Sequence, residues 1–242
     1  MAVEGGRRRI GSTKVGLWPI FVEMNSSVSV PRRQVSGLPP QLARRLFGVL
    51  RPIDARGVYA SPGPEFARLT RRGLLHKVAT GYYAIVPPDS TDRAWLPSVE
   101  AAAYGIAAAD YGPDGAVLMG VSAARIHGAL PRAVAVAVVA VEKRRPVLAL
   151  ADRAATVRFV LRDTARLDAE RVGTDLGPAL VTTVEQTVLD LAHRPGLGGG
   201  ADEAREAVRA LWPRAEPARL RMIAQGQRLR AALARAGDWA QG

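Results

Sequence analysis

The chain has 242 residues, a net charge of +12 and 48% hydrophobic residues, so one large domain or two small ones are possible. It has no cysteine, which excludes a disulfide framework, a thiolate zinc site and a cysteine nucleophile, and we expect a cytoplasmic protein. Its longest clean apolar stretches are nine residues, about half the length of a membrane-spanning helix, which excludes a membrane partner.

Residues 1–36 have no hydrophobic periodicity and are rich in Arg, Gly, Ser and Val. We predict a flexible basic N-terminal extension, either a mobile arm or a stretch that precedes an internal start at Met24. Arg7–Arg9 and Val15–Val22 resemble parts of a signal peptide. Pro19 interrupts that apolar run and no cleavage pattern follows, so we expect no export.

Gln41 to Leu50 has a helical apolar stripe and follows two prolines, which predicts a supporting helix. Arg44 and Arg45 point away from this stripe. Arg51 to Ser61 contains a proline and a turn-like Ala-Arg-Gly, and we expect a short linking element there.

Pro64 to Arg72 is the next predicted helix, with Pro64 in its first turn and Gly73 just past its last. Phe66, Leu69 and Thr70 fall on one side of it, and the basic residues project elsewhere. Those basic residues are Arg68, Arg71 and, on the flank, Arg72.

Two apolar-rich runs, Leu74 to Ala79 and Tyr82 to Val86, flank Thr80-Gly81. This pattern predicts a β-hairpin directly after the helix, with Lys77 and Tyr82 on or beside it. A helix followed by such a hairpin is typical of a winged helix-turn-helix domain, which would span residues 37–90.

The charge distribution bears on whether this region binds DNA. Residues 1–95 carry 15 Lys and Arg against 6 Asp and Glu, whereas residues 96–242 carry 19 against 16. A local excess of arginine attracts phosphate, although it carries no sequence information by itself. The alternative is a solvated helix face in a chain whose 31 Arg and 3 Lys partly reflect codon bias.

Pro87 to Asp92 reads as a linker, after which residues 91–242 are predicted to form a mixed α/β domain. Pro97 to Ala109 is expected to be helical, and Ser122 is expected to cap a helix that reaches His127 to Leu130. Ala133 to Val141 is apolar on both faces and predicts a strand that is covered on both sides. Ala155 to Leu161 predicts a second strand with Arg158 facing outward, and Val147 to Ala151 is expected to pair between the two.

Thr182 and Thr183 offer two overlapping capping boxes, with Glu185 and Gln186, for a helix through Leu191. Ala201 to Trp212 and Pro217 to Ala236 read as amphipathic helices. The predicted fold class is therefore α+β: a winged helix-turn-helix domain, then an α/β domain with a small sheet and C-terminal helices.

No constellation of residues predicts catalysis, a metal or a cofactor. Gly196 to Gly200 follows a helix and lacks the Lys-Ser/Thr of a phosphate loop, and the surroundings of Ser122 lack the second glycine of a nucleophile elbow. The three histidines are scattered. Asp163 and Asp190 are better explained by salt bridges with neighbouring arginines.

Four blocks, in this order, resemble the AbiEi family of antitoxins: RLTRRGLLHKVATGYYAIVP, GVSAARIHGALPRAVAVAVVAV, VRFVLRD and LVTTVEQTVLDLAHRP. The resemblance covers roughly residues 40–195. It implies a winged helix-turn-helix that represses its own operon, and a C-terminal domain that counters a nucleotidyltransferase-like toxin in a type IV system, in which a stable complex is not required.

By this resemblance, Arg68, Arg71, Arg72 and Lys77 would contact double-stranded operator DNA, with Thr80 and Tyr82 of the hairpin and Arg44 and Arg45 of the supporting helix beside them. Three alternatives remain open. The chain could be a stand-alone winged-helix regulator, a protein-interaction module without operator binding, or a hydrolase or nuclease that uses Asp163 or Asp190.

Overall fold

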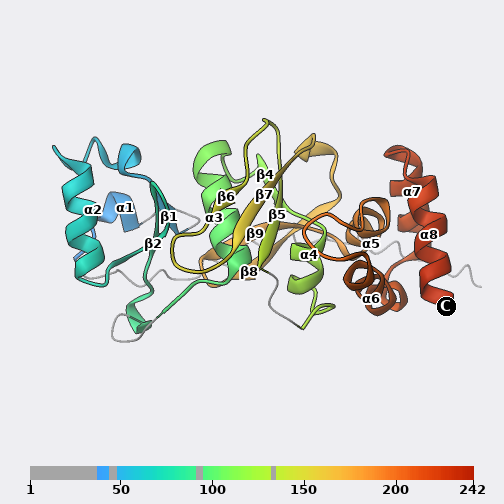
Figure 1. Cartoon of the computed structure of the whole chain (residues 1–242). Coiled ribbons are helices and arrows are strands. Elements are labelled where there is room, and N and C mark those ends of the chain that lie inside the picture. The colour runs from blue at the N-terminus through green and yellow to red at the C-terminus, as the bar shows by residue number, and fades with distance from the viewer. Residues whose placement is uncertain (1–36, 44–47, 91–94, 132–134) are drawn as a thin grey trace, which may run out of the picture. The chain divides into compact units, whose positions relative to one another are not determined.

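The computed structural model describes residues 37–43, 48–90, 95–131 and 135–242 (Figure 1). Residues Arg33–Gly242 form one compact unit, and the predicted extension over residues 1–36 lies outside the described residues. None of the helices within these ranges has the length and apolar character needed to cross a bilayer.

The first part of the unit combines short helices with a small antiparallel sheet of strand order β1-β3-β2. Its elements are α1 (Pro40–Ala43), β1 (Val49–Leu50), a 3₁₀ turn η1 (Pro52–Ala55), α2 (Pro62–Arg71), β2 (Leu75–Ala79) and β3 (Tyr82–Ile85). Leu42, Leu50, Phe66, Leu69 and Leu75 form most of its core.

The predicted supporting helix over Gln41–Leu50 is wrong at its C-terminal end. Val49 and Leu50 form a strand that pairs with Ala84 and Tyr83 of β3. Gly48, at φ +61°, takes a left-handed conformation that an α-helix cannot continue through, and the β-branched Val49 suits a strand. Burying both apolar residues against β3 outweighs their local helical pattern.

A mixed sheet of six strands, in the order β6-β7-β5-β4-β9-β8, forms the second part. Its central strand, β5 (Val136–Val141), pairs in parallel with β7 (Thr156–Leu161) and antiparallel with β4 (Ala116–Leu118). The remaining strands are β6 (Leu148–Ala149), β8 (Ala169–Thr174) and β9 (Gly177–Thr182). This confirms an α+β fold, with a larger sheet than the small one predicted.

Helices cover both faces of this sheet. One face packs on α3 (Val99–Tyr111), which follows the short 3₁₀ turn η2 (Pro88–Ser90). The other face packs on α4 (Val121–Ile126), α5 (Val184–His193) and α6 (Ala201–Leu211). Residues 137–141 of β5 are fully buried because both of its faces are covered, as the apolar run predicted.

The C-terminal helices differ from the prediction in one place. Pro217 to Ala236 is two helices, α7 (Pro217–Gly226) and α8 (Arg230–Gln241), rather than one. Arg228 between them has φ +59°, a conformation that an α-helix cannot continue through. The turn lets α7 and α8 pack on each other and on α5.

Three further local predictions need correction. Val147–Ala151 does not pair between the two predicted strands, because β5 pairs directly with β7 and β6 lies outside it. Ser122 lies inside α4 and Gly120 is its N-cap residue. Thr182 ends β9 and caps no helix, whereas the Thr183 side chain does accept the Gln186 N–H.

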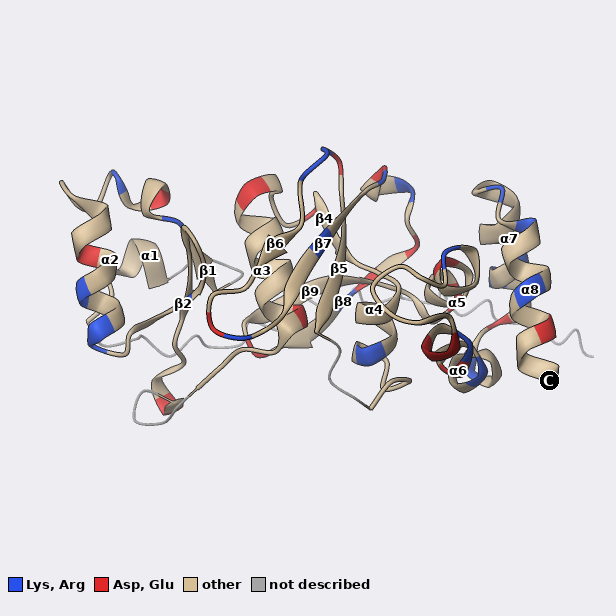
Figure 2. Ribbon diagram, viewed as in Figure 1, with Lys and Arg blue, Asp and Glu red and all other residues tan. Residues whose placement is uncertain are grey.

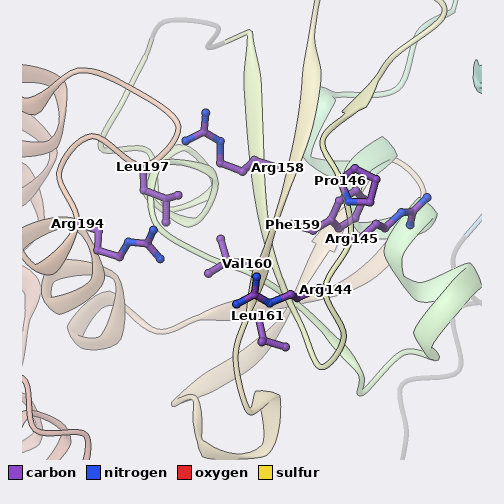
Figure 3. Close-up of a pocket in the computed structure, with 9 residues that line it drawn as sticks. All are labelled: Arg144, Arg145, Pro146, Arg158, Phe159, Val160, Leu161, Arg194 and Leu197. Atoms are coloured by element: carbon purple, nitrogen blue, oxygen red, sulfur yellow. The ribbon is translucent and has the colours of Figure 1, made fainter.

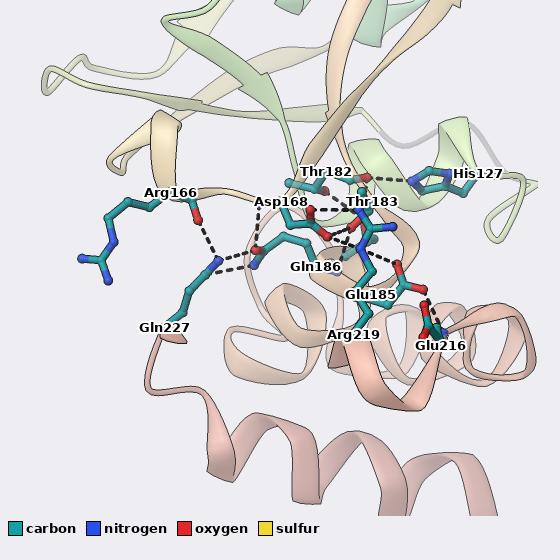
Figure 4. A network of polar contacts seen from close by, with 11 residues as sticks. His127, Arg166, Asp168, Thr182, Thr183, Glu185, Gln186, Glu216, Arg219 and Gln227 are labelled. Carbon is teal, nitrogen blue, oxygen red and sulfur yellow. Dashed lines mark hydrogen bonds and ion pairs between the residues drawn. The ribbon is translucent and has the colours of Figure 1, made fainter. Parts of the chain in front are cut away.

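A polar network joins α7 to the start of α5 and the sheet (Figure 4). The Asp168 carboxylate accepts two hydrogen bonds from Arg219, at 2.7 and 2.9 Å, and one from the Thr183 hydroxyl at 2.8 Å. Gln227 exchanges side-chain hydrogen bonds with Gln186. Burial acts to raise the pKa of Asp168, but the hydrogen bonds from Arg219 and Thr183 lower it by more, so this carboxylate stays ionised.

Candidate nucleic-acid interface

Helix α2 has well-defined ends. It begins two residues earlier than predicted, at Pro62, where a proline costs no hydrogen bond. Its acidic residue, Glu65, lies in the first turn and its basic residues, Arg68 and Arg71, in the last, as the helix dipole favours. Gly73 follows at φ +69°, which confirms the left-handed end predicted from the sequence.

One face of α2 is fixed against the small sheet. Phe66 and Leu69 are fully buried, and the rings of Phe66 and of Tyr83 on β3 pack in a T-shaped arrangement with centroids 5.1 Å apart. The Thr70 hydroxyl donates to the Phe66 carbonyl at 2.8 Å. This packing sets the rotation of the helix, so it also decides which side chains face outward.

The outward face of α2 is basic. Arg68, Arg71 and Arg72 are all exposed, and the basic part of the helix lies away from the strands (Figure 2). Arg68 pairs with Glu65 at 2.8 Å, but both side chains are partly in water, and such a pair contributes less than about 1 kcal/mol. Within the described residues, Arg71 and Arg72 make no ion pair.

The predicted hairpin is confirmed as β2 and β3, joined by Thr80-Gly81 with Gly81 at φ +84°. Lys77 lies opposite Tyr83, so it shares the hairpin face that meets α2. Lys77 and Thr80 are exposed. The structure therefore brings Lys77 to the same side of the hairpin as the basic helix.

Tyr82 is placed differently from the other predicted contacts. Its hydroxyl hydrogen-bonds the Asp110 carboxylate at 2.8 and 3.0 Å, and Arg145 donates to it at 2.9 Å. Burial raises the pKa of the Tyr82 phenol. Since this hydroxyl is engaged inside the protein, we leave Tyr82 out of the interface. Arg44 and Arg45 lie outside the described residues.

Asp110 is the residue that sequence reasoning missed. It also accepts hydrogen bonds from Arg145 and, at 2.7 Å, from Arg51, so one carboxylate joins β3, α3 and two loops. Arg51 and Asp110 are 59 positions apart, and nothing in the local pattern of either signals the pair. The hairpin is held in place by contacts that only the fold creates.

The rejected catalytic candidates have structural roles here. The Ser122 hydroxyl accepts the Val138 N–H at 2.8 Å inside the core. Glu203 caps the Gly200 N–H at 2.8 Å, so a carboxylate already occupies the end of α6 where a phosphate loop would hold its anion. Within the described ranges, no three His, Asp or Glu gather as metal ligands.

Comparison with known proteins gives a family. A family model described as the AbiEi antitoxin C-terminal domain matches residues 115–239, just over half of the chain. The crystal structure of the RV2827C protein from Mycobacterium tuberculosis matches with a TM-score of 0.54 at 21% identity, over 82% of this chain and 72% of that one, and so shares its fold. No curated protein matches. The chain belongs to the AbiEi antitoxin family.

Proposed function

We propose that this protein is a cytoplasmic antitoxin that represses its own operon through a winged helix and counters a nucleotidyltransferase-like toxin. Residues 37–90 would form the DNA-binding domain and residues 91–242 the antitoxin domain. One observation carries the DNA-binding part: Arg68 and Arg71 on α2 and Arg72 just after it are exposed, and the other face of α2 is packed against the hairpin that bears Lys77.

In this proposal α2 enters the major groove, and the hairpin contacts the adjacent phosphates through Lys77 and Thr80. Arg68 would read a base edge, most simply guanine, where a bidentate contact contributes about 1–3 kcal/mol of discrimination. To bind DNA, Arg68 would have to leave its ion pair with Glu65. Breaking this pair costs little free energy because the pair is exposed. Arg71 and Arg72 would neutralise phosphates on either side of the helix.

The toxin would be countered by the six-stranded sheet and its C-terminal helices, the region that the antitoxin family model matches. No enzymatic step is part of the proposal, and a stable complex with the toxin is not required. Binding of the DNA and neutralisation of the toxin would therefore fail separately when the relevant surfaces are changed.

The first test is a mobility-shift assay with the DNA upstream of the native gene. Replacing Arg68→Ala and Arg71→Ala together should abolish specific retardation and reduce the salt slope of binding by about 1, because the base contact of Arg68 and the phosphate contact of Arg71 are lost. The matched control removes the same charge elsewhere: Arg221→Ala with Arg230→Ala, both exposed on α7 and α8. If both double variants bind like the wild type, α2 is not the reading helix.

The second test is growth rescue after expression of the neighbouring toxin-like gene. We expect rescue by the wild type and equally by the Arg68→Ala/Arg71→Ala variant, since the antitoxin region is unchanged. Operator binding without rescue would favour a stand-alone regulator. Rescue without operator binding would favour a protein-interaction module.

A further inference from the structure

A basic hollow lies beside β7, far along the chain from α2. Its volume is about 690 Å³, and none of the described residues that line it is Asp or Glu. It is formed by residues from the loop after β5, from β7 and from the segment after α5: Arg144, Arg145, Pro146, Arg158, Phe159, Val160, Leu161, Arg194 and Leu197 (Figure 3).

Three of its four arginines are available to a ligand. The Arg145 side chain already has partners, because its guanidinium donates a hydrogen bond to Asp110 and lies 4.3 Å from the centroid of the Phe159 ring. Arg144, Arg158 and Arg194 are exposed, and their side chains make no hydrogen bond or ion pair with any described residue. They approach the hollow from three segments, around Val160 and Leu197 (Figure 3).

The edge of β7 explains why the hollow stays open. On this side, β6 pairs only with Thr156 and Val157. Continuing the same register would place Pro146 opposite Phe159, and a proline has no N–H to extend the ladder. No other strand among the described residues covers the rest of this edge, and Leu161 there is 50% exposed.

We propose that this hollow binds the phosphate group of a nucleotide-sized ligand. A guanidinium presents its N–H groups as a planar fork, and three forks around one space match an anion with three or more oxygens better than a single carboxylate. The apolar floor of Val160 and Leu197 suits a sugar or base, and the volume lies within the range of small-molecule sites.

This site does not depend on operator binding by α2. It also differs from a phosphate loop, because Glu203 already occupies the nearby end of α6 and the anion would be held by side chains instead. The phosphate could belong to a free nucleotide, to an inorganic polyphosphate or to a nucleic-acid strand, and the three sources are separated by the choice of probe.

The test is titration calorimetry on the full chain at about 150 mM salt, where weak non-specific attraction is screened. The probes are ATP, inorganic triphosphate and a six-nucleotide single-stranded DNA. The hollow variant is Arg158→Ala with Arg194→Ala. Two matched controls remove the same charge, Arg221→Ala with Arg230→Ala and Arg68→Ala with Arg71→Ala, and far-UV circular dichroism checks that each variant is folded.

We expect at least one probe to bind the wild type and both controls equally, and the hollow variant to bind it about tenfold more weakly or worse, since two charge-assisted contacts are lost. Tighter binding of ATP than triphosphate identifies a nucleotide, equal binding an inorganic anion, and binding of the DNA alone a strand. Binding of none of the probes, or equal losses in the hollow variant and the Arg221/Arg230 control, would overturn the proposal.

Discussion

Asp190 on α5 is an ionisable group buried in the core, where its charged form is unfavourable. Its side chain is 1% exposed, with Arg162 at 3.6 Å and the Gln186 amide donating to one oxygen at 3.1 Å. The other oxygen, Oδ2, is buried and has no hydrogen-bond partner among the described residues. Burial raises the pKa of Asp190 from 3.8 to about 6, more than the charge of Arg162 lowers it.

A raised carboxyl pKa makes the folded state bind the proton more tightly than the unfolded state. The stability that this proton gives is complete below pH 3.8 and is lost as the pH rises through about 6. Asp190→Asn removes the ionisation, so the variant should become more stable than the wild type by up to roughly 3 kcal/mol at pH 8, but not at pH 4. Urea unfolding at both pH values measures the difference.

Comparing the Asp190→Asn variant with the wild type at each pH cancels the contributions of the other titrating groups to the free energy of unfolding. Asp152 and Asp168 have lowered pKa values, so the stability that they contribute is lost only as the pH falls below about 3.8, outside this window. A gap between variant and wild type that is the same at pH 4 and pH 8 would show that Asp190 titrates normally.

At the scale of elements, Asp110 couples the hairpin to α3. Arg51 follows β1, Tyr82 begins β3 and Arg145 lies in the loop before β6, and all three donate to this one carboxylate. The Arg145 guanidinium also lies 5.4 Å from the Tyr82 ring centroid. The half-buried Asp110 is therefore shared by two guanidinium groups and a phenol, although Arg51 also pairs with Asp54 at 2.9 Å.

Removing this anion should loosen the hairpin. Asp110→Ala leaves Arg145 without a carboxylate partner among the described residues, whereas Arg51 keeps Asp54 at 2.9 Å, and we expect a loss of about 2 kcal/mol of unfolding free energy, with faster hydrogen exchange in β2 and β3. Asp114→Ala is the control, because its pair with Arg171 is on the surface, with Asp114 83% exposed, and should contribute less than about 1 kcal/mol. Equal effects of the two substitutions would exclude a coupling role for Asp110.

Elements with strong local signals were predicted from the sequence, and elements defined by their partners were not. Helix α2 and the hairpin were found because Gly73 and Thr80-Gly81 mark their ends. The β8–β9 hairpin was missed: β8 is AERVGT, half of it charged or glycine, and it is a strand only because it pairs along β9.

The same distinction holds for the candidate site. The outward face of Arg68 and Arg71 follows from the helical period around Phe66 and Leu69, so it could be predicted. The inward position of the Tyr82 hydroxyl could not, because it depends on an aspartate 28 positions away. The grouping of Arg158 with Arg194 likewise exists only after β7 and α5 have packed.

At the scale of the whole molecule, the hairpin lies between two cores. Leu75, Tyr83 and Ile85 pack with α2, whereas Val78 and Ala84 belong to the core that contains α3 and β5. The Ala151 N–H donates to the Val78 carbonyl at 2.8 Å, and His76 contacts Asp152 at 2.8 Å. The strands that bear the proposed DNA contacts are thus also part of the packing of the larger sheet.

We therefore expect residues 37–242 to unfold in one cooperative step, although the sequence predicts a domain boundary near residue 90. Scanning calorimetry should give a calorimetric enthalpy equal to the van't Hoff enthalpy. Two resolved transitions would mean that residues 37–90 fold independently. In the Asp110→Ala variant the unfolding transition should broaden or split, because the contacts that hold the two cores together are weakened. Shared packing of this kind couples the stability of the two regions, while exposed side chains such as Arg68 and Arg71 can be replaced without disturbing either core.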